Sequence, residues 1–366
     1  MSCSPIGTLI LLLPEQGVGS IGVSQACTEA AYTVRIGTQW CVVRGSERGP
    51  RFDAVSRPVF ASSSRLVYLA RQGKDWHVEI WGEHPWPRFR IADDSDPSRF
   101  PIVTSKDGKS IAVAVSEPQG VLLLIDGRRA GRFAHLQDLQ WCESARQFMA
   151  IVLNDDGFGI FKNGNVEHVQ LNLDYVELRQ TSRGDPYVRA SDGNNSFFGP
   201  PNRLVKFPYL FVDVWAISPD GSNLALVTET SDGNQVLVVN GNERMNFKGH
   251  ARFVYVRPTN QSDYAIALIE PDGRHFVVTG EKKIGPFHEI LSLSFCPEGL
   301  EVCSHIGSPS GECLVIGNRS TALFDRILCF RFSPDGKDLS LCVQKGREIW
   351  HYQLAMRSLG VSSSKK

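Results

Sequence analysis

The chain has 366 residues, and its 39 lysine and arginine residues are balanced by 39 aspartate and glutamate residues, so the formal net charge is zero. A neutral chain produces no general field that attracts nucleic acid or an anionic membrane. Hydrophobic residues make up 42% of the sequence, which is enough for the core of a globular protein. We therefore expect no nucleic acid among the partners.

The first apolar run, TLILLLP at 8–14, is too short to span a membrane, which takes about 18 apolar residues. No basic residue precedes it, as one would in a secretory signal. We predict a strand here and no membrane span. The nine cysteines are an odd number without CxxC spacing, which favours a reducing compartment. The predicted location is the cytoplasm, and periplasmic export is the alternative.

A G-x-G-x-x-G motif follows at 17–22. In a dinucleotide-binding fold such glycines bring a pyrophosphate to the start of a helix. Here 14–16 (Pro-Glu-Gln) separate the motif from the apolar run, and Arg44 rather than an acid ends the next apolar segment. We predict a glycine-rich loop at the closure of the fold and no cofactor, with nucleotide binding as an alternative.

The rest of the chain repeats one pattern, in which apolar alternation stops at a turn and resumes. The turn is clearest as Ser-Pro-Asp-Gly at 218–221 and 333–336. Proline presets one turn dihedral, aspartate bonds its own backbone and glycine accepts a positive φ, so each copy predicts strand, turn, strand. More divergent copies occupy 58–70, 102–115, 139–152, 176–190, 254–269 and 294–306.

Each copy is followed by a third apolar strand that ends near a glycine, and mostly by a fourth segment with an aromatic residue. These glycines recur every 35 to 45 residues, at Gly45, Gly82, Gly127, Gly164, Gly199, Gly241, Gly280 and Gly317. Four short strands with this period indicate a propeller blade. We predict an all-β fold, a single closed β-propeller of eight or nine four-stranded blades over 1–357, with a flexible tail at 358–366.

The predicted ring also needs a closure. The last unit, around 348–353, has only three strands. The spare strand at 8–13 is expected to complete it, because an unpaired apolar edge invites aggregation.

The order of strand, SPDG turn, strand, then V-x-x-x-G and G-P-x-F-x-x-V, resembles the WD40-like (PD40) repeat of TolB-type β-propellers over 40–355. Gly249-His250, Trp81 and Trp350 are similar to true WD40 repeats, but the aspartate after the tryptophan is missing. The resemblance implies a non-catalytic scaffold or recognition role, with a protein or peptide as the partner.

Residues that could carry chemistry are scattered. Carboxylates gather at 92–98 and 154–157 without the six or more ordered oxygens of a calcium site, and Asp155 and Asp156 are the candidates in the second group. Three histidines, His135, His250 and His288, fall near the starts of inner strands, and we predict no metal there.

The nucleophile motif G-x-S-x-G and the zinc motif H-E-x-x-H are both absent from the sequence. A hydrolase or lyase acting in an axial channel is the alternative function. Its weak candidates at the channel mouth are Asp138, Arg179, Asp213 and Arg257.

Two segments depart from the repeat and are candidate partner-binding surfaces. Segment 79–91 contains His84 and Trp86, and Trp86 stands between two prolines, where it either anchors a partner or, as we favour, packs under its own loop. Segment 192–211 is rich in proline and aromatic residues. The candidate residues are His84, Trp86, Phe197, Phe198 and Tyr209.

Overall fold

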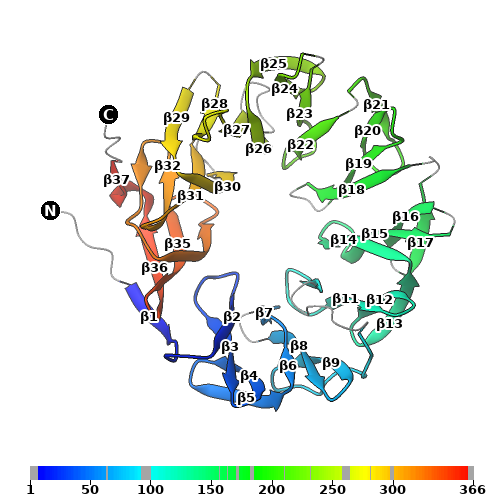
Figure 1. Ribbon diagram of the computed structural model, residues 1–366, viewed down its shortest axis with the longest axis vertical. Coiled ribbons are helices and arrows are strands. Elements are labelled where there is room, and N and C mark those ends of the chain that lie inside the picture. Colours follow the sequence, from blue (N-terminus) through cyan, green and yellow to red (C-terminus); the bar gives the residue numbers. More distant parts are fainter. Residues whose placement is uncertain are drawn as a thin grey trace.

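The computed structural model describes residues 7–62, 65–91, 100–155, 157–162, 164–169, 173–181, 185–209, 211–230, 232–257, 264–280, 282–296 and 301–361. They form nine antiparallel sheets arranged as a ring around one axis (Figure 1). The predicted single closed β-propeller is confirmed, with nine blades. Within the described ranges, no helix is long and apolar enough to cross a bilayer.

The blades follow one another in chain order. Blade 1 comprises β2 Val18–Val23, β3 Ala30–Ile36, β4 Gln39–Arg44 and β5 Glu47–Phe52, and blade 2 comprises β6 Ala54–Val55, β7 Val59–Phe60, β8 Leu66–Gln72 and β9 Asp75–Ile80. Blade 3 comprises β10 Ile102–Thr104, β11 Ile111–Glu117, β12 Gly120–Ile125 and β13 Arg128–Phe133. Blade 4 comprises β14 His135–Cys142, β15 Gln147–Asn154, β16 Gly157–Lys162 and β17 Asn165–His168. In blade 2, an isolated bridge between Trp76 and Phe89 stands in for the outermost strand.

Blade 5 comprises β18 Tyr175–Gln180, β19 Pro186–Ser191, β20 Ser196–Gly199 and β21 Val205–Phe207. Blade 6 comprises β22 Val212–Ile217, β23 Leu224–Glu229, β24 Gln235–Val239 and β25 Asn242–Phe247. Blade 7 comprises β26 His250–Val256, β27 Tyr264–Ile269, β28 His275–Thr279 and β29 Lys282–Phe287. The first strand of each of these blades is the innermost, as β18 and β22 show in Figure 1.

Blade 8 comprises β30 Glu289–Phe295, β31 Val302–Ser308, β32 Gly311–Ile316 and β33 Arg319–Ser320. After the short 3₁₀ helix η2 (Met356–Ser358), the two-residue strand β37 (Gly360–Val361) pairs with β33. Two residues of the segment expected to be a flexible tail therefore pair with a sheet.

Blade 9 closes the ring with strands from both ends of the chain. It comprises β34 Arg326–Phe332, β35 Asp338–Lys345, β36 Glu348–Ala355 and β1 Gly7–Leu12, and β1 pairs antiparallel with β36 from Gly7↔Tyr352 to Leu12↔Glu348. Leu11 and Leu13 are buried with Ile349 in a cluster that extends into blade 1. The prediction that the N-terminal strand completes the last blade is confirmed.

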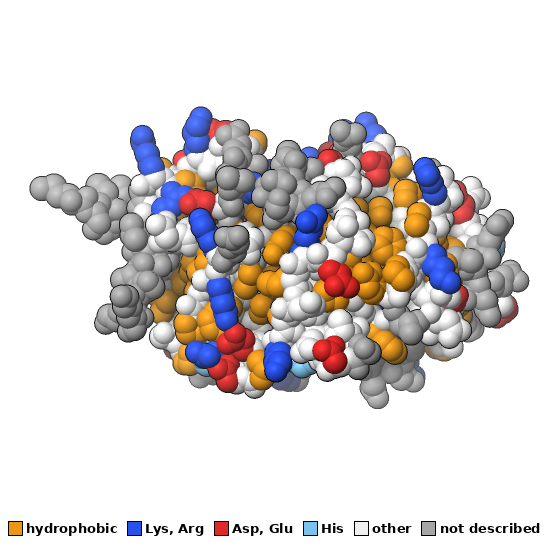
Figure 2. All heavy atoms as spheres, turned by 90° about the horizontal axis from the view of Figure 1, so that it is seen from above, with side chains coloured by type: hydrophobic (Ala, Val, Ile, Leu, Met, Phe, Trp, Pro, Cys, Tyr) orange, Lys and Arg blue, Asp and Glu red, His pale blue; other side chains and the backbone are white. Residues whose placement is uncertain are grey.

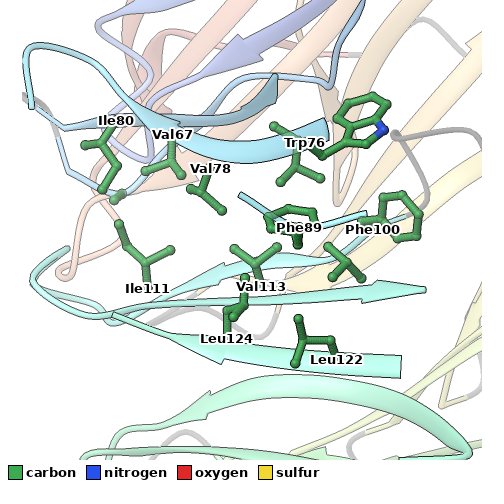
Figure 3. Close-up of a cluster of buried hydrophobic side chains, with 13 residues drawn as sticks. Val67, Trp76, Val78, Ile80, Phe89, Phe100, Ile111, Val113, Leu122 and Leu124 are labelled. Carbon is green, nitrogen blue, oxygen red and sulfur yellow. The ribbon is translucent and has the colours of Figure 1, made fainter. Parts of the chain in front are cut away.

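The core lies between the blades rather than inside any one of them. Figure 3 shows Val67, Val78 and Ile80 of blade 2 pointing toward Ile111 and Val113 of blade 3. The second strand of a blade is covered on both sides, so 66–70 in β8 is a continuous apolar run with every residue buried. Seen from the side, the ring shows a middle band of hydrophobic side chains, with charged side chains mostly above and below it (Figure 2).

The glycine-rich motif at 17–22 forms most of strand β2, so the loop expected there was wrong. A Cβ on Gly22 would lie 2.1 Å from the carbonyl oxygen of Pro58, and one on Gly19 would lie 2.5 Å from Thr33 Oγ1. These glycines allow the innermost strand of blade 1 to approach its neighbours closely. The next element is another strand, β3, rather than the helix that a dinucleotide site requires.

The Ser-Pro-Asp-Gly turn is held by the serine hydroxyl. In blade 6, Ser218 Oγ donates to Asp220 Oδ1 at 2.7 Å and accepts from the backbone N–H of Asn223 at 2.9 Å. The Gly221 N–H donates to the carbonyl oxygen of Ser218 at 2.8 Å, with Gly221 at φ 78°. A buried hydroxyl thus satisfies polar groups that the tight turn would otherwise leave unpaired.

The same bonds recur at 333–338 and at 105–110, where lysine replaces the proline. Serine and aspartate, rather than proline, therefore define the turn chemically. The hydrogen bond from the Ser333 hydroxyl is the largest of several that lower the pKa of Asp335, to about 2.

We expect Ser218→Ala to lower the free energy of unfolding by about 2 kcal/mol, because it leaves a buried backbone N–H without its acceptor. Chemical denaturation measures the change. Ser46→Ala, at an exposed turn of blade 1, is the control and should change stability by less than about 0.5 kcal/mol. Equal effects of the two substitutions would contradict the role given to the hydroxyl.

Strand β1 allows a second test within a single strand. Leu11 is 5% exposed and Leu12 is 56% exposed. We expect Leu11→Ala to destabilise the protein by about 2–3 kcal/mol, because it opens a cavity in the closure between blades 9 and 1. Leu12→Ala should be nearly neutral in the same denaturation experiment, and a comparable loss there would argue against burial as the cause.

Candidate functional site

A groove of ≈ 1080 Å³ lies between blades 5 and 6. Its walls are the β18–β19 connection at Asp185, the β20–β21 turn at 199–203, and the β22–β23 turn at 220–222. All three connections lie at the same end of their antiparallel blades. The groove therefore opens on one loop face of the ring, beside the segment 192–211 that departs from the repeat.

Aromatic rings form the floor of the groove. Phe198 is 1% exposed and packs edge-on against Phe207 at 5.2 Å and against Trp215 at 5.7 Å between ring centroids. Tyr187 packs against Trp215 at 6.1 Å. Burial raises the pKa of Tyr187, so its phenol stays neutral. Interlocked rings of this kind give a rigid apolar surface.

A tight loop forms the outer rim. A Cβ on Gly199, at φ 151°, would lie 2.2 Å from the carbonyl oxygen of Arg203, so glycine is needed there. The Arg203 N–H donates to the carbonyl oxygen of Pro200 at 2.8 Å. This loop positions the exposed Arg203 and Val205 side chains beside the groove, and Val205 is 53% exposed.

Charges of both signs surround the apolar floor. Asp185 and Arg203 are exposed at the rim, and Lys162 pairs with Glu167. Desolvation opposes ionisation of Asp220, but hydrogen bonds from Ser218 and Ser222 outweigh it and lower the pKa of Asp220. The groove therefore offers an apolar centre, with anionic and cationic contacts at different points of its rim.

The structure separates the candidates of segment 192–211. Phe198 is at the groove floor, whereas Phe197 is half-buried on the opposite face of β20, against the cluster between blades 4 and 5. Tyr209 is half-buried against the same cluster as Phe198, and burial, with a smaller effect of Glu243, raises the pKa of Tyr209. Tyr187 and Phe207 were not predicted from the sequence, although Phe207 lies within the candidate segment 192–211.

A polar cluster on β18, β19 and β22 joins blades 5 and 6. Glu177 Oε2 accepts from Trp215 Nε1 at 2.6 Å, and Glu177 Oε1 pairs with Arg179 at 3.0 Å. Arg189 lies 3.8 Å from Glu177 and donates to the carbonyl oxygen of Val212 at 2.6 Å. Glu177 and Arg189 were not predicted from the sequence. Alternation along β18 places Tyr175, Glu177 and Arg179 on one face, which is a signal for Glu177, whereas Arg189 lies on β19.

The four channel candidates also make specific contacts. Asp138 Oδ2 accepts from the Leu178 N–H at 2.9 Å, and Asp213 accepts from the Gln235 side chain. Desolvation raises the pKa of Asp138. The other two candidates, Arg179 and Arg257, lie over the rings of Trp215 at 4.5 Å and Phe295 at 4.3 Å. The contacts of Asp138 and Arg179 connect the inner strands of adjacent blades, whereas Asp213 on β22 contacts Gln235 on β24 within blade 6.

The structure does not bring the candidate metal ligands together. His135, His250 and His288 are exposed on or beside different strands. In the part of the chain that the structure describes, no group of three or more His, Cys, Asp or Glu side chains could hold a metal ion. Asp155 is exposed, while Asp156 and the segment 92–98 lie outside the described residues.

The other candidate surface lies at blade 2. His84 is exposed, whereas Trp86 is half-buried and packs against the core between blades 2 and 3. The backbone N–H of Trp86 donates to the carbonyl oxygen of Val78 at 2.9 Å. The indole ring would lie 3.4 Å from a Cβ on Gly127. Partner binding by His84 and Trp86 stays a prediction.

We expect Trp86→Ala to lower the free energy of unfolding by about 1–2 kcal/mol, because the indole covers apolar surface of two blades. Thermal and chemical denaturation measure this loss. His84→Ala, two residues away and exposed, serves as the control with little effect on stability. A fully stable Trp86→Ala protein would mean that the indole contributes nothing to the core.

Comparison with known proteins identifies no family. No family model matches the sequence, and no curated protein matches it. A solved structure described as "Crystal structure of the eukaryotic initiation factor" is similar, with a TM-score of 0.51 and 14% identity over 91% of this chain and 97% of that chain. At such identity the similarity shows the fold alone.

Two further structures align with lower scores. The Dos1 propeller has a TM-score of 0.41 and 10% identity, over 94% of this chain and 95% of that one. The dihydro-heme d1 dehydrogenase NirN in complex with DHE has a TM-score of 0.46 and 12% identity, over 86% and 75%. The resemblance of the repeat to TolB-type PD40 propellers stays a prediction. The chain is a nine-bladed β-propeller.

Proposed function

We propose that the protein is a non-catalytic recognition module that binds an extended segment of a partner protein in the groove between blades 5 and 6. The groove itself carries the proposal, with its rigid floor of Phe198, Phe207 and Tyr187 beside the exposed Val205. An apolar, aromatic centre inside a polar rim is the usual anatomy of a protein interface.

The size and rim chemistry of the groove favour a peptide. Its ≈ 1080 Å³ is slightly above the range for small-molecule pockets, about 300–1,000 Å³, which suits several residues of an extended chain. Pro186, Pro200 and Pro201 stiffen the walls, so little conformational entropy is lost when a ligand binds. Asp185 and Arg203 can each pair with a residue of opposite charge, which sets the direction of the peptide.

Two of the three carboxylates that line the groove are engaged by neighbouring groups. Asp220 accepts hydrogen bonds within its own turn, and Glu167 pairs with Lys162. A carboxylate that already accepts such bonds is a weaker general base, and the third, Asp185, is exposed at the rim. The alternative, a hydrolase or lyase in an axial channel, stays a prediction. Glu177, on the inner strand β18, is engaged by Trp215 and Arg179.

A random peptide library displayed on phage tests the proposal against the immobilised full chain. We expect enriched peptides to bind Val205→Asp at least about 10-fold more weakly, because a charge beside the apolar floor costs more than about 1.4 kcal/mol. Leu323→Asp is the matched control, since Leu323 is similarly exposed, at 49%, before strand β34. It should bind the peptides as the wild type does.

Fluorescence polarisation with a labelled enriched peptide gives the affinities, and circular dichroism verifies that both variants fold. The proposal fails if the enriched peptides bind Val205→Asp and Leu323→Asp equally well. It also fails if no sequence is enriched on the folded wild-type chain.

A further inference from the structure

The charges at the rim of the groove between blades 5 and 6 are separated by sign. Asp185 lies at the β18–β19 connection and Asp220 at the β22–β23 turn, whereas Arg203 lies in the β20–β21 turn. The first two connections join the innermost strand of a blade to the second, and the β20–β21 turn joins the third strand to the outermost. Figure 1 shows β18 toward the axis and β21 at the periphery. By its described residues, the groove is therefore acidic at its inner end and basic at its outer end.

The two acidic turns are held against each other by Thr181. Its backbone N–H donates to the carbonyl oxygen of Asp185 at 3.0 Å, and its Oγ1 accepts from the Asp185 N–H at 3.1 Å. On its other side, a Cβ on Gly221 would lie 3.1 Å from Thr181 Cγ2. Thr181 is buried between the loop that carries Asp185 and the turn that carries Asp220. The two carboxylates therefore belong to one end of the groove.

Both carboxylates keep oxygens for a ligand. The hydrogen bonds from Ser218 and Ser222 to Asp220 all end on Oδ1, and no bond from the described residues reaches its Oδ2. The Asp185 carboxylate is exposed and forms no ion pair within the same part of the chain. Two neighbouring carboxylates attract a cation, and the fork of an arginine guanidinium matches their oxygens. The inner end therefore suits a basic side chain.

Arg203 is the corresponding group at the outer end. Its side chain is exposed and has no acidic partner among the residues that the structure describes. Lys162, which also lines this side of the groove, is already paired with Glu167. Arg203 can therefore bind a carboxylate of the partner.

The distance between the two ends sets the spacing of the residues that they bind. The inner and outer turns of blade 5 are two strand spacings apart, which is about 10 Å. An extended peptide rises about 3.3 Å per residue, so it passes from one end to the other in about three residues. A side chain between these two contacts lies over the aromatic floor of Tyr187, Phe198 and Phe207. The groove therefore specifies positions along a peptide as well as its composition.

We propose that the groove recognises a segment in which a basic and an acidic residue stand about three positions apart, with a large apolar residue between them. The basic residue binds the carboxylates of Asp185 and Asp220, the acidic residue binds Arg203, and the apolar side chain packs on the aromatic floor. This pattern rests on the proposed function, because it names the class of peptide that the same groove binds. Complementary charges at the two ends favour such a segment over partners of the wrong charge.

The full chain is immobilised and screened with a random peptide library displayed on phage, and one enriched peptide is synthesised. We expect the enriched sequences to share the basic, apolar and acidic positions. Asp185→Lys and Arg203→Glu should each weaken binding of the synthetic peptide by about 5-fold or more, the scale of a solvent-exposed ion pair. Arg35→Glu, at an exposed arginine on β3 of blade 1, is the charge-matched control and should bind as the wild type does.

Charge reversal on both sides gives a readout that damage to the loop would not. A second peptide, with its acidic residue changed to lysine, should bind Arg203→Glu at least about 5-fold more tightly than it binds the wild type. A disturbed loop would weaken both peptides instead, and that result overturns the assignment of Arg203.

The outcomes also separate this pattern from the proposed function. Enriched peptides that depend on Val205 but lack the charged positions would overturn the pattern and leave peptide binding in the groove intact. Unchanged affinity of Asp185→Lys and Arg203→Glu would do the same. If no peptide is enriched, or if Val205→Asp binds the peptides as the wild type does, the proposed function itself fails and the pattern fails with it.

Discussion

The structure depends on one constraint, which is that each blade is a small sheet with two apolar faces. Strand β8 illustrates this constraint. Every residue of 66–70 is buried, so side chains on both faces of the small sheet are covered. A single blade cannot cover both of its own faces, so it is stable only between two neighbours. A ring satisfies this requirement for every blade at once, because it has no terminal blade with a bare face.

The same constraint explains why the two ends of the chain meet in blade 9. The strands β34, β35 and β36 leave an open outer edge, and β1 from the other end pairs with it. Leu11 then packs with Ile349 into the cluster shared with blade 1. The closure is therefore both a hydrogen-bonded ladder and an apolar contact, and Cys27, Cys329 and Cys342 are part of that contact.

Regular packing also explains where a binding groove can arise. Apolar side chains fill the space between most adjacent blades, as between blades 2 and 3 (Figure 3). In blade 5, the β20–β21 connection at 199–203 lies beside the β22–β23 turn of blade 6. The hollow between them has an aromatic floor because Phe198 and Trp215 belong to the core of adjacent blades. The candidate site is thus a local exception within a repeating scaffold.

The sequence by itself determined the blade architecture, because period-two alternation and the Ser-Pro-Asp-Gly turn are local patterns whose bonds span at most six residues. It also identified β1 as the closing strand, since an apolar strand needs a partner. Only the tertiary structure decided the count of nine blades, the strand conformation of 18–23, and the grouping of Tyr187, Phe198 and Phe207. These depend on contacts between residues distant in sequence, such as Gly22 against Pro58, which no local pattern specifies.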